Sequence, residues 1–431
     1  MIQTVSPATS LSGTVLLPGD KSISHRYAML AAIAEGTSTI EYFAASRDCH
    51  STLECLQSLG VEARQRGQTV TIKGRGLRGL KAPAHVLDAG NSGTTIRLLS
   101  GILAGHPFES LITGDESLSN RPMGRVIRPL QMMGADIESR ERELPPLRIR
   151  GGSLKGIRYS LPVASAQVKS CVLFAGLYGD ASTAVEETIP TRDHSEIALR
   201  EFGGTLRIQG NWIEVDPGPT LQGRHLVVPG DLSGAAFFLV AAALVPNSEL
   251  LLPGVGLNGR RRELLDYLLR AGLNIKVENE TAIAGEPRGD LRVRYSQELL
   301  QRPLPPIQGE QVANLIDEIP VLAVLGAQAS GGLTISDAHE LRVKESDRIS
   351  AIVTNLRAMG IEVEEKADGL SMPGGQQLQG ADIVTRNDHR IAMAFAVAAL
   401  AARGETRIHN PECADVSFPG FWTALRNVIA M

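Results

Sequence analysis

Apolar residues follow a pattern that repeats six times along the chain. In each copy a polar turn is followed by a segment rich in Ala, Gly and Leu that is apolar on most faces: residues 24–34, 94–104, 168–177, 233–245, 319–327 and 391–401. A helix that is apolar nearly all round is buried. The pattern therefore predicts six buried helices, one in each unit of about 70 residues.

The rest of each unit predicts strands and a second helix. A G-x-S/T-x-I strand follows the buried helix, and the second helix ends at a glycine, which is Gly60, Gly134, Gly203, Gly272 or Gly360; the sixth copy is expected to close near residues 421–422. Glycine directly after the last helical residue is the usual left-handed cap. We therefore expect an α/β fold of six strand-helix-strand-helix-strand units, with central helices inward and sheets facing water.

The repeats divide naturally into two domains of three units. Pro/Gly-rich turns at 217–219 and 229–231 separate the third unit from the fourth. We expect one domain over 20–228 and another over 1–19 plus 229–431, because the short strand before Asp20 can pair back with the second half. Short strands, and no long flexible linker, would join them, with the active site in the cleft between them.

Composition narrows the class of protein. The 431 residues are 43% hydrophobic and 21% charged, with a net charge of −4, so the basic excess of a nucleic-acid binder is absent. The four cysteines form no CxxC pair, and no His cluster has zinc spacing, so we expect reduced thiols and no metal. No signal peptide or membrane-spanning run is found. These features predict a cytoplasmic protein with no membrane or nucleic-acid partner.

Polar residues stand at the start of each buried helix, where free N–H groups and the helix dipole favour anions. In the stretch 18–26 (PGDKSISHR), Lys21, Ser22 and Arg26 can form a phosphate or carboxylate cradle. The order differs from a Walker A loop. In 88–97 (DAGNSGTTIR), Gly93 permits close backbone approach to a ligand. A capped surface turn is the simpler interpretation of either stretch taken alone.

Further candidates follow in the later units. Arg121 stands before a proline in GDESLSNRPM, which suits bidentate anion binding, although a lone arginine is more often solvated. Hydroxyl and amide groups in the third unit suit a polyol or a phosphate; they are carried by the segments Ser165-Ala166-Gln167 and Thr191-Arg192-Asp193-His194. By themselves these two segments are weak signals.

Carboxylates and cations mark the fifth and sixth units. Asp317 precedes a buried helix, where a plain cap is the commoner role. Lys344 and Arg348, four residues apart in RVKESDR, are expected on one helix face, with Glu345 near them. Arg390 stands at the mouth of the last buried helix. If the six helix starts meet, their cations would suit two multiply charged anionic substrates, and the carboxylates would suit proton transfer between them.

Seven of these segments, taken in order, resemble the EPSP synthase family. They are PGDKSISHR, GNSGTTIRLLSG, GDESLSNRPM, SAQVKS, DEIPVLA, LRVKESDRI and NDHRIAMAFA, and the resemblance spans residues 12–422. The SLxxRPM and SAQVKS segments look more like the bacterial second class. The resemblance implies two domains of three β-α-β-α-β-β units around pseudo-threefold axes, closing on substrate, and enolpyruvyl transfer from phosphoenolpyruvate to the 5-hydroxyl of shikimate 3-phosphate without cofactor.

The resemblance also implies a role for each candidate. Shikimate 3-phosphate would be held by Lys21, Ser22, Arg26, Ser165, Ala166, Gln167, Thr191, Asp317 and Lys344. Phosphoenolpyruvate would be held by Lys21, Gly93, Arg121, Gln167, Arg348 and Arg390. Asp317 would take the proton of the attacking hydroxyl, and Glu345, with Lys21, would protonate the methylene carbon. We also expect a monomer that glyphosate inhibits moderately at most, in competition with phosphoenolpyruvate, because Gly93 and Thr94 leave an open position.

The chain departs from the family pattern at three places. Val416 stands where many members have a lysine, which puts one contact to phosphoenolpyruvate in doubt. Glu340 stands where plant-like members often have Asn, and Ala166 offers no hydroxyl.

Two other functions compete with this interpretation. The enolpyruvyl transferase that acts on UDP-N-acetylglucosamine shares the fold, but typically has Lys-Asn in place of Lys21-Ser22 and a Cys in the loop before Arg121. A non-catalytic relative that binds phosphorylated metabolites should lose its acid/base carboxylates first, and here Asp317 and Glu345 are both present.

Overall fold

The chain folds into two compact units, each with its own hydrophobic core. The computed structural model describes residues 1–430. The first unit consists of Gly19–Val228 with Ala282–Glu286, and the second of Met1–Pro18, Pro229–Thr281 and the chain from Pro287 onward. Among residues 1–430, no helix has both the length and the apolar character needed to cross a membrane.

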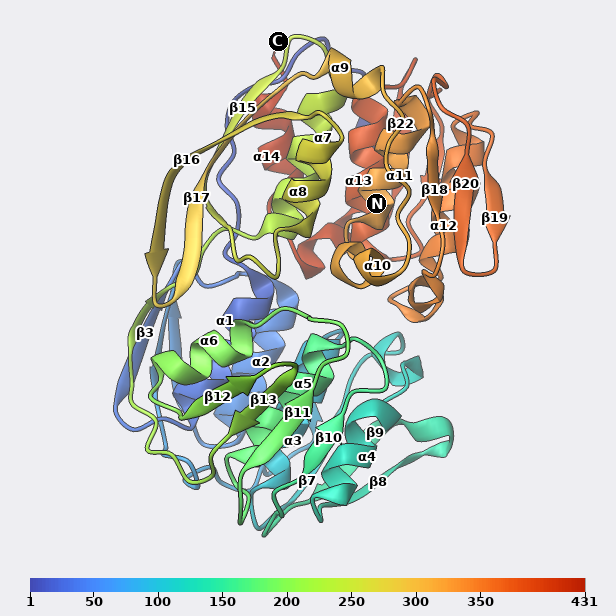
Figure 1. Ribbon diagram of the computed structural model, residues 1–431. Helices are drawn as coiled ribbons and strands as arrows, with labels where there is room; N and C mark the ends of the chain where they lie inside the picture. The colour runs from blue at the N-terminus through green and yellow to red at the C-terminus, as the bar shows by residue number, and fades with distance from the viewer. Residues whose placement is uncertain (431) are drawn as a thin grey trace. The chain divides into compact units, whose positions relative to one another are not determined.

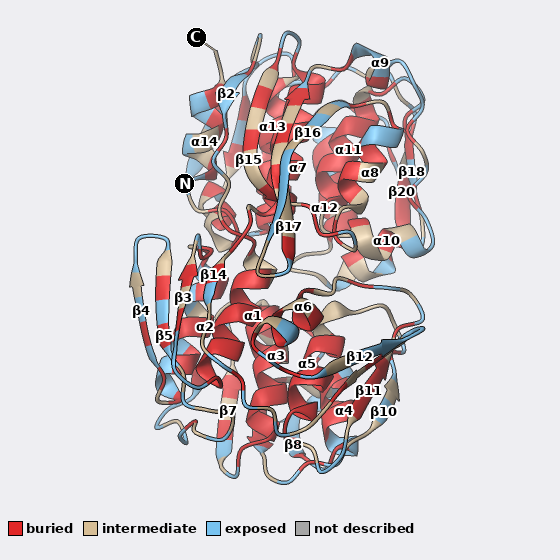
Figure 2. Ribbon diagram, turned by 60° about the vertical axis from the view of Figure 1, so that its left-hand side comes forward, coloured by how far each residue is buried: buried red, intermediate tan, exposed pale blue. Residues whose placement is uncertain are grey.

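Three buried helices form the centre of each unit, as the apolar pattern predicts (Figure 1). In the first unit they are α1 (Lys21–Ala32), α3 (Gly93–Ala104) and α5 (Ala166–Gly176), and in the second α7 (Leu232–Leu244), α11 (Ile319–Gln328) and α13 (His389–Leu400). Every residue of α7 and α13 is buried, and Figure 2 shows these helices red along their length. The six expected buried helices are therefore confirmed.

Close packing of α3 on α5 depends on a glycine. An ideal Cβ on Gly101 would lie 2.2 Å from the carbonyl oxygen of Cys171, closer than real Cβ atoms approach a backbone oxygen. The two helix axes can approach as they do because residue 101 has no side chain.

The strands form six sheets within residues 1–430, three in each unit, and the pairing follows one plan. In the first unit the strand after each central helix pairs parallel on one side and antiparallel on the other. The three sheets there are, in strand order, β14 (His225–Val227), β3 (Thr37–Glu41), β5 (Thr69–Lys73), β4 (Glu62–Arg66); β6 (Leu87–Asp88), β7 (Glu109–Thr113), β9 (Leu144–Arg150), β8 (Asp136–Arg140); and β10 (Arg158–Ser160), β11 (Thr183–Glu186), β13 (Trp212–Val215), β12 (Leu206–Gln209).

The N-terminal strands complete sheets of the second unit. Strand β1 (Ile2–Val5) pairs antiparallel with β22 (Thr406–His409), and β2 (Ser12–Thr14) pairs parallel with β15 (Glu249–Gly256). The pairing of the short strand before Asp20 with the second half is thus confirmed. The remaining strands of these sheets are β16 (Asn274–Ile283), β17 (Glu286–Arg294), β18 (Leu333–Ile335), β19 (Glu364–Lys366), β20 (Gly369–Met372) and β21 (Asp382–Val384).

Outer helices follow the central ones in every unit of the repeat. They are α2 (Arg47–Ser58), α4 (Gly124–Met132), α6 (His194–Glu201), α8 (Glu263–Arg270), α12 (Arg348–Ala358) and α14 (Phe421–Val428), with two shorter helices, α9 (Gln297–Leu300) and α10 (Glu310–Leu315). The glycines expected to end the first five all have positive φ: Gly60, Gly134, Gly203, Gly272 and Gly360. The expectation that the sixth repeat closes near residues 421–422 is wrong, because α14 begins at Phe421, directly after Gly420.

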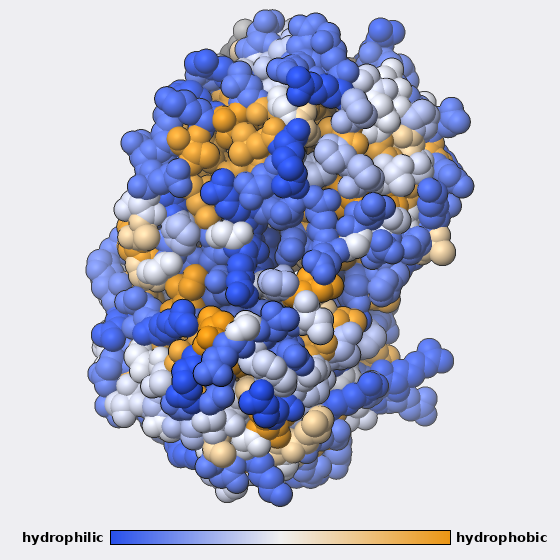
Figure 3. All heavy atoms as spheres, in the orientation of Figure 1, coloured by the Kyte–Doolittle hydropathy of each residue, from blue (hydrophilic) through white to orange (hydrophobic). Residues whose placement is uncertain are grey.

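The surface seen from one side is mostly polar. On the face drawn in Figure 3, hydrophilic residues predominate, and the hydrophobic residues form several groups, of which the largest lies in the upper part of the view. Strands such as β5 alternate buried and exposed residues, as expected for sheets with one face toward water.

Candidate active site

In the first unit, Lys21 is held by a carboxylate that the sequence pattern did not reveal. Asp20 caps α1 by accepting a hydrogen bond from the Ile23 amide at 2.9 Å, so Lys21 begins the helix. Nζ of Lys21 lies 2.9 Å from Oδ2 of Asp48 on α2. Because both side chains are largely buried, the lysine is oriented and charge-compensated at the same time.

Arg26 is buried with three donors committed to the protein. Its Nε donates to Ser195 at 2.7 Å, Nη2 donates to Ser170 at 2.9 Å, and Nη1 donates to the carbonyl of Ser22 at 2.8 Å. Burial lowers the pKa of Arg26 to about 10, and nearby carboxylates, Glu196 first, partly offset that shift. A guanidinium has five N–H donors, so two remain for an anion.

The start of α3 brings together small and cationic residues. An ideal Cβ on Gly93 would lie 2.8 Å from Nη1 of Arg97 and 3.6 Å from Nη1 of Arg121, so glycine keeps these guanidiniums accessible. Arg121 donates through Nη2 to Asn91 at 2.8 Å and to Ser117 at 3.0 Å. Asn91 belongs to the stretch 88–97 and Ser117 to GDESLSNRPM, but the sequence does not predict that they accept hydrogen bonds from Arg121.

Gln167 is oriented from both ends. Its Oε1 accepts from Nη1 of Arg97 at 2.8 Å, and its Nε2 donates to Oγ1 of Thr94 at 3.0 Å. This polar chain joins the start of α5 to α3. Ser165, directly before Gln167's helix, caps α5 by accepting from the Val168 amide.

Thr191 contacts a buried cluster of ion pairs. Nζ of Lys169 lies 3.0 Å from Glu187 and 2.6 Å from Glu196. Burial raises the pKa of Glu196, and Lys169 partly offsets that shift. The amide and the hydroxyl of Thr191 both donate to Oε1 of Glu187. The hydroxyl proton of Thr191 is therefore directed at Glu187.

In the second unit, the predicted acid/base carboxylates gather around one arginine. Nη1 of Arg348 lies 3.5 Å from Asp317, and Nη2 donates to Glu345 at 2.6 Å. Nε donates to Asp388 at 2.9 Å, and Nζ of Lys344 lies 3.6 Å from Asp317. Burial alone lowers the pKa of Arg348, but the carboxylates, Asp388 first, raise it above its usual range.

Lys344 and Arg348 do not share a helix face, so that expectation is wrong. A 3-10 helix (His339–Val343) ends before Lys344, and α12 begins only at Arg348, where Asp347 caps it by accepting from the Ser350 amide. Asp347 offers the oxygen that favours a helix start at this point. The two cations are nevertheless close, because both contact Asp317.

Arg390 sits in a second cluster of this unit. Its Nη1 lies 4.0 Å from Glu318 and 3.4 Å from the Ser233 carbonyl oxygen. Arg261 also lies beside Glu318, with 3.9 Å between Nη1 and Oε1, and it contacts Ser233 as well. The sequence interpretation missed Arg261, and its position in an NGRRRE run on an outer segment carried no signal for a buried site. Asp388 caps α13 by accepting from the Arg390 amide.

The departures from the family pattern occupy short helical turns. Glu340 lies in the 3-10 helix before Lys344, and Val416 ends another 3-10 helix (Pro411–Val416). Within residues 1–430 no group of three or more His, Cys, Asp or Glu side chains is arranged to hold a metal ion.

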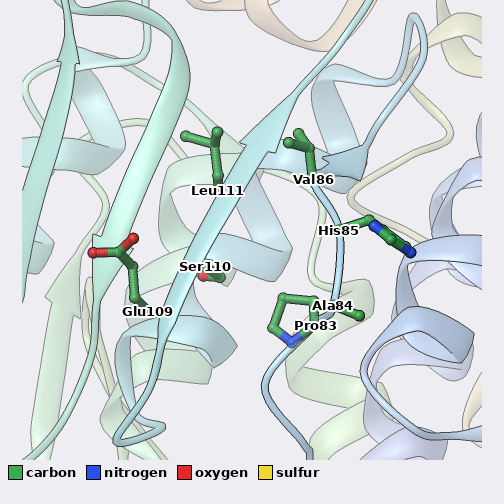
Figure 4. Close-up of a pocket in the computed structure, with 7 residues that line it drawn as sticks. All are labelled: Pro83, Ala84, His85, Val86, Glu109, Ser110 and Leu111. Carbon is green, nitrogen blue, oxygen red and sulfur yellow. The ribbon is translucent and has the colours of Figure 1, made fainter.

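A surface depression of the first unit lies apart from these clusters. It is lined by the segment before β6 and by β7 (Figure 4): Pro83, Ala84, His85, Val86, Glu109, Ser110 and Leu111. None of the predicted site residues belongs to this lining, so the depression carries none of the predicted chemistry.

Comparison with solved structures first defines the class. The structure resembles the enolpyruvyl transferase NikO from Streptomyces tendae with a TM-score of 0.76, covering 99% of this chain and 97% of that one, at 18% identity. It also resembles EPSP synthase from Acinetobacter baumannii with a TM-score of 0.86 and 42% identity, over 99% of this chain and 98% of that one. The fold is thus that of the two-domain enolpyruvyl transferases.

Sequence comparison then defines the family. Residues 5–425 match the profile described as EPSP synthase (3-phosphoshikimate 1-carboxyvinyltransferase). The 3-phosphoshikimate 1-carboxyvinyltransferase of Solibacter usitatus is 53% identical over 99% of this chain and its own full length, and that of Geobacillus kaustophilus is 47% identical over the same shares. The chain belongs to the EPSP synthase family and is a transferase. The UDP-N-acetylglucosamine alternative is disfavoured.

Proposed function

We propose that the chain transfers the enolpyruvyl group of phosphoenolpyruvate to the 5-hydroxyl of shikimate 3-phosphate. The observation that carries the proposal is the second-unit cluster in which Asp317 and Glu345 both contact Arg348, with Lys344 beside Asp317. Such a cluster combines proton-transfer groups with cations for anionic substrates.

The acceptor would be held mainly by polar groups of the first unit. The two uncommitted N–H groups of Arg26 suit a phosphate or a hydroxyl pair, and Ser22, Ser165, Ala166 and Gln167 stand at the starts of α1 and α5. Lys344 of the second unit would add a cation. Thr191 would contribute through its hydroxyl lone pairs or its loop, since its proton is directed at Glu187.

Phosphoenolpyruvate would be held by Lys21, Gly93, Arg121, Gln167, Arg348 and Arg390. Arginines bind carboxylates and phosphates with paired N–H groups, which fixes orientation as well as charge. Because Arg348 is surrounded by Asp317, Glu345 and Asp388, its guanidinium is oriented before any substrate arrives.

In the addition step, Asp317 would accept the proton of the 5-hydroxyl as its oxygen bonds to C2 of phosphoenolpyruvate. Glu345, with Lys21, would deliver a proton to C3, which becomes a methyl group. The product is a tetrahedral phospho-ketal. In the elimination step the C2–O bond to phosphate breaks, and the methyl group returns one proton to the enzyme, so that the vinyl ether forms. The arginines would stabilise the leaving phosphate.

The test of these roles is Asp317→Asn, which keeps the shape of the side chain but removes the base. We expect kcat for phosphate release to fall by roughly 10²–10⁴-fold, the usual contribution of a positioned general base, with KM values changing less. Asp337→Asn is the matched control, because Asp337 is an acidic residue of the same unit that caps a loop by accepting from the Gly309 amide. Equal kcat in Asp317→Asn and the parent would contradict the assignment.

A further inference from the structure

Two serines from different helices hold one edge of the Arg26 guanidinium. Ser170 lies on α5 and Ser195 on α6, and their Oγ atoms are 2.6 Å apart. Nε of Arg26 donates to Ser195, and Nη2 donates to Ser170. Ser170 is the last residue of the SAQVKS segment, but the sequence analysis assigns a role to neither serine.

The hydrogen-bond directions follow from the chemistry of the groups. Arginine can only donate, so both serine oxygens accept from it. The Ser170 hydroxyl donates to the Ala166 carbonyl at 2.6 Å, so the proton between the serines comes from Ser195. Each hydroxyl proton is thus used inside the network, and neither serine has one left for an anionic ligand.

A buried ion pair supports this arrangement from the adjacent positions. Lys169 precedes Ser170 and Glu196 follows Ser195, and Nζ of Lys169 lies 2.6 Å from Oε1 of Glu196. Both side chains are at most 1% exposed. Two neighbouring links therefore connect α5 to α6, and separating the charged link would leave uncompensated charge in the interior.

The serine contacts leave one edge of the guanidinium for a ligand. Nε and Nη2 face the serines, and one N–H of Nη1 donates to the Ser22 carbonyl. Nη1 and Nη2 form the terminal edge of the guanidinium, and each keeps one N–H group that can donate to an oxyanion.

We propose that Ser170 and Ser195 are positioning residues for acceptor binding. They fix the rotation of the Arg26 guanidinium so that its terminal edge meets shikimate 3-phosphate. This inference rests on the proposed role of Arg26 in binding the acceptor. The serines act through Arg26 and do not contact the substrate.

The first test is the pair of single variants Ser195→Ala and Ser170→Ala. We expect the KM for shikimate 3-phosphate, and its Kd for the enzyme alone, to rise about tenfold, the factor that corresponds to one charge-assisted hydrogen bond. The values of kcat and the KM for phosphoenolpyruvate should stay within about twofold. Because the two serines lie on different helices, loss of folding in one variant leaves the other to decide.

Ser100→Ala is the matched control. Ser100 is a buried serine on the central helix α3, and its hydroxyl donates to the Ile96 carbonyl at 2.6 Å, just as Ser170 donates to Ala166. We expect its acceptor KM to equal that of the parent. A tenfold rise in Ser100→Ala as well would assign the effect to general loosening of the core and overturn the proposal.

The second test repeats Ser195→Ala in an Arg26→Lys background, because lysine cannot use the serine contacts in the same way. If Ser195 acts through Arg26, Ser195→Ala adds less than twofold to the acceptor KM there. A full tenfold effect in that background, or no effect of either serine in the parent, overturns the positioning role. An unchanged acceptor KM in Arg26→Lys alone would instead overturn the proposed role of Arg26.

Discussion

Two cations of the candidate site are paired with carboxylates that lie far away in the sequence. Lys21 is paired with Asp48, 27 residues on, and Arg348 with Asp388, 40 residues on. Local motifs mark the cations, because these stand at helix starts where anions bind. They cannot mark the carboxylates, since which residues meet across two helices is decided by packing.

A buried chain of hydroxyl groups also joins residues that are distant in the sequence. Nδ1 of His25 lies 2.6 Å from Oγ1 of Thr52, which lies 2.6 Å from Oγ1 of Thr95, and Thr95 donates to Ser92 at 2.7 Å. Ser92 in turn caps α3. The chain of hydroxyls connects α1, which carries Lys21, to the start of α3.

The buried imidazole of His25 predicts a pH dependence of stability. Burial, with Lys21 and Arg26 nearby, holds the pKa of His25 well below its usual value of 6.5. Above pH 6.5 the histidine is neutral in both folded and unfolded chains. Below pH 6.5 only the unfolded chain takes up the proton, so stability is lost as pH falls.

We therefore expect His25→Gln to lose less stability than the parent between pH 7 and pH 5.5. The difference should be about 1 kcal/mol in the free energy of unfolding, measured with urea at both pH values. His50 on α2 is solvent-exposed, so His50→Gln is the matched control. A loss in His25→Gln as large as in the parent would contradict the neutral state of this side chain.

At the scale of elements, the repeat pattern predicts most of the architecture. The six central helices lie where the apolar segments are, within three residues at their starts, and the left-handed glycines close five outer helices. These features are local and periodic, so they can be found in the sequence. The interruption between Lys344 and Arg348 was missed because a charged run does not reveal that Asp347 starts a new helix.

Helix packing gives a prediction at this scale. Gly101→Ala would place a methyl group against the Cys171 carbonyl oxygen, a backbone atom that cannot move alone. We expect a net loss of about 1–2 kcal/mol in the free energy of unfolding, because overpacking outweighs the gain in helix propensity. The Arg97–Gln167 hydrogen bond between α3 and α5 should weaken as well.

Gly234→Ala on α7 serves as the comparison for Gly101→Ala. Its Cβ would lie 3.4 Å from the Phe418 ring, an ordinary contact. Thermal and urea denaturation of both variants should show Gly101→Ala less stable and Gly234→Ala close to the parent. Equal stabilities of the two variants would show that α3 and α5 can separate at little cost.

At the scale of the whole molecule, the sequence pattern accounts for the α/β architecture of six repeats and for the family. Nothing in the sequence marks residues 282–286 as part of the first of the two compact units, because the hairpin that carries them continues an ordinary strand pattern. Arg261 and the cluster of Lys169, Glu187 and Glu196 were missed for a related reason. Their significance arises only from the folded neighbours.

The most direct measurement is release of inorganic phosphate from phosphoenolpyruvate by the purified protein with no acceptor, with shikimate 3-phosphate, or with UDP-N-acetylglucosamine. We predict release that requires shikimate 3-phosphate, in equal amounts with the enolpyruvyl product. Release with the sugar nucleotide alone would contradict the acceptor assignment, and binding of shikimate 3-phosphate without any release would contradict the catalytic one.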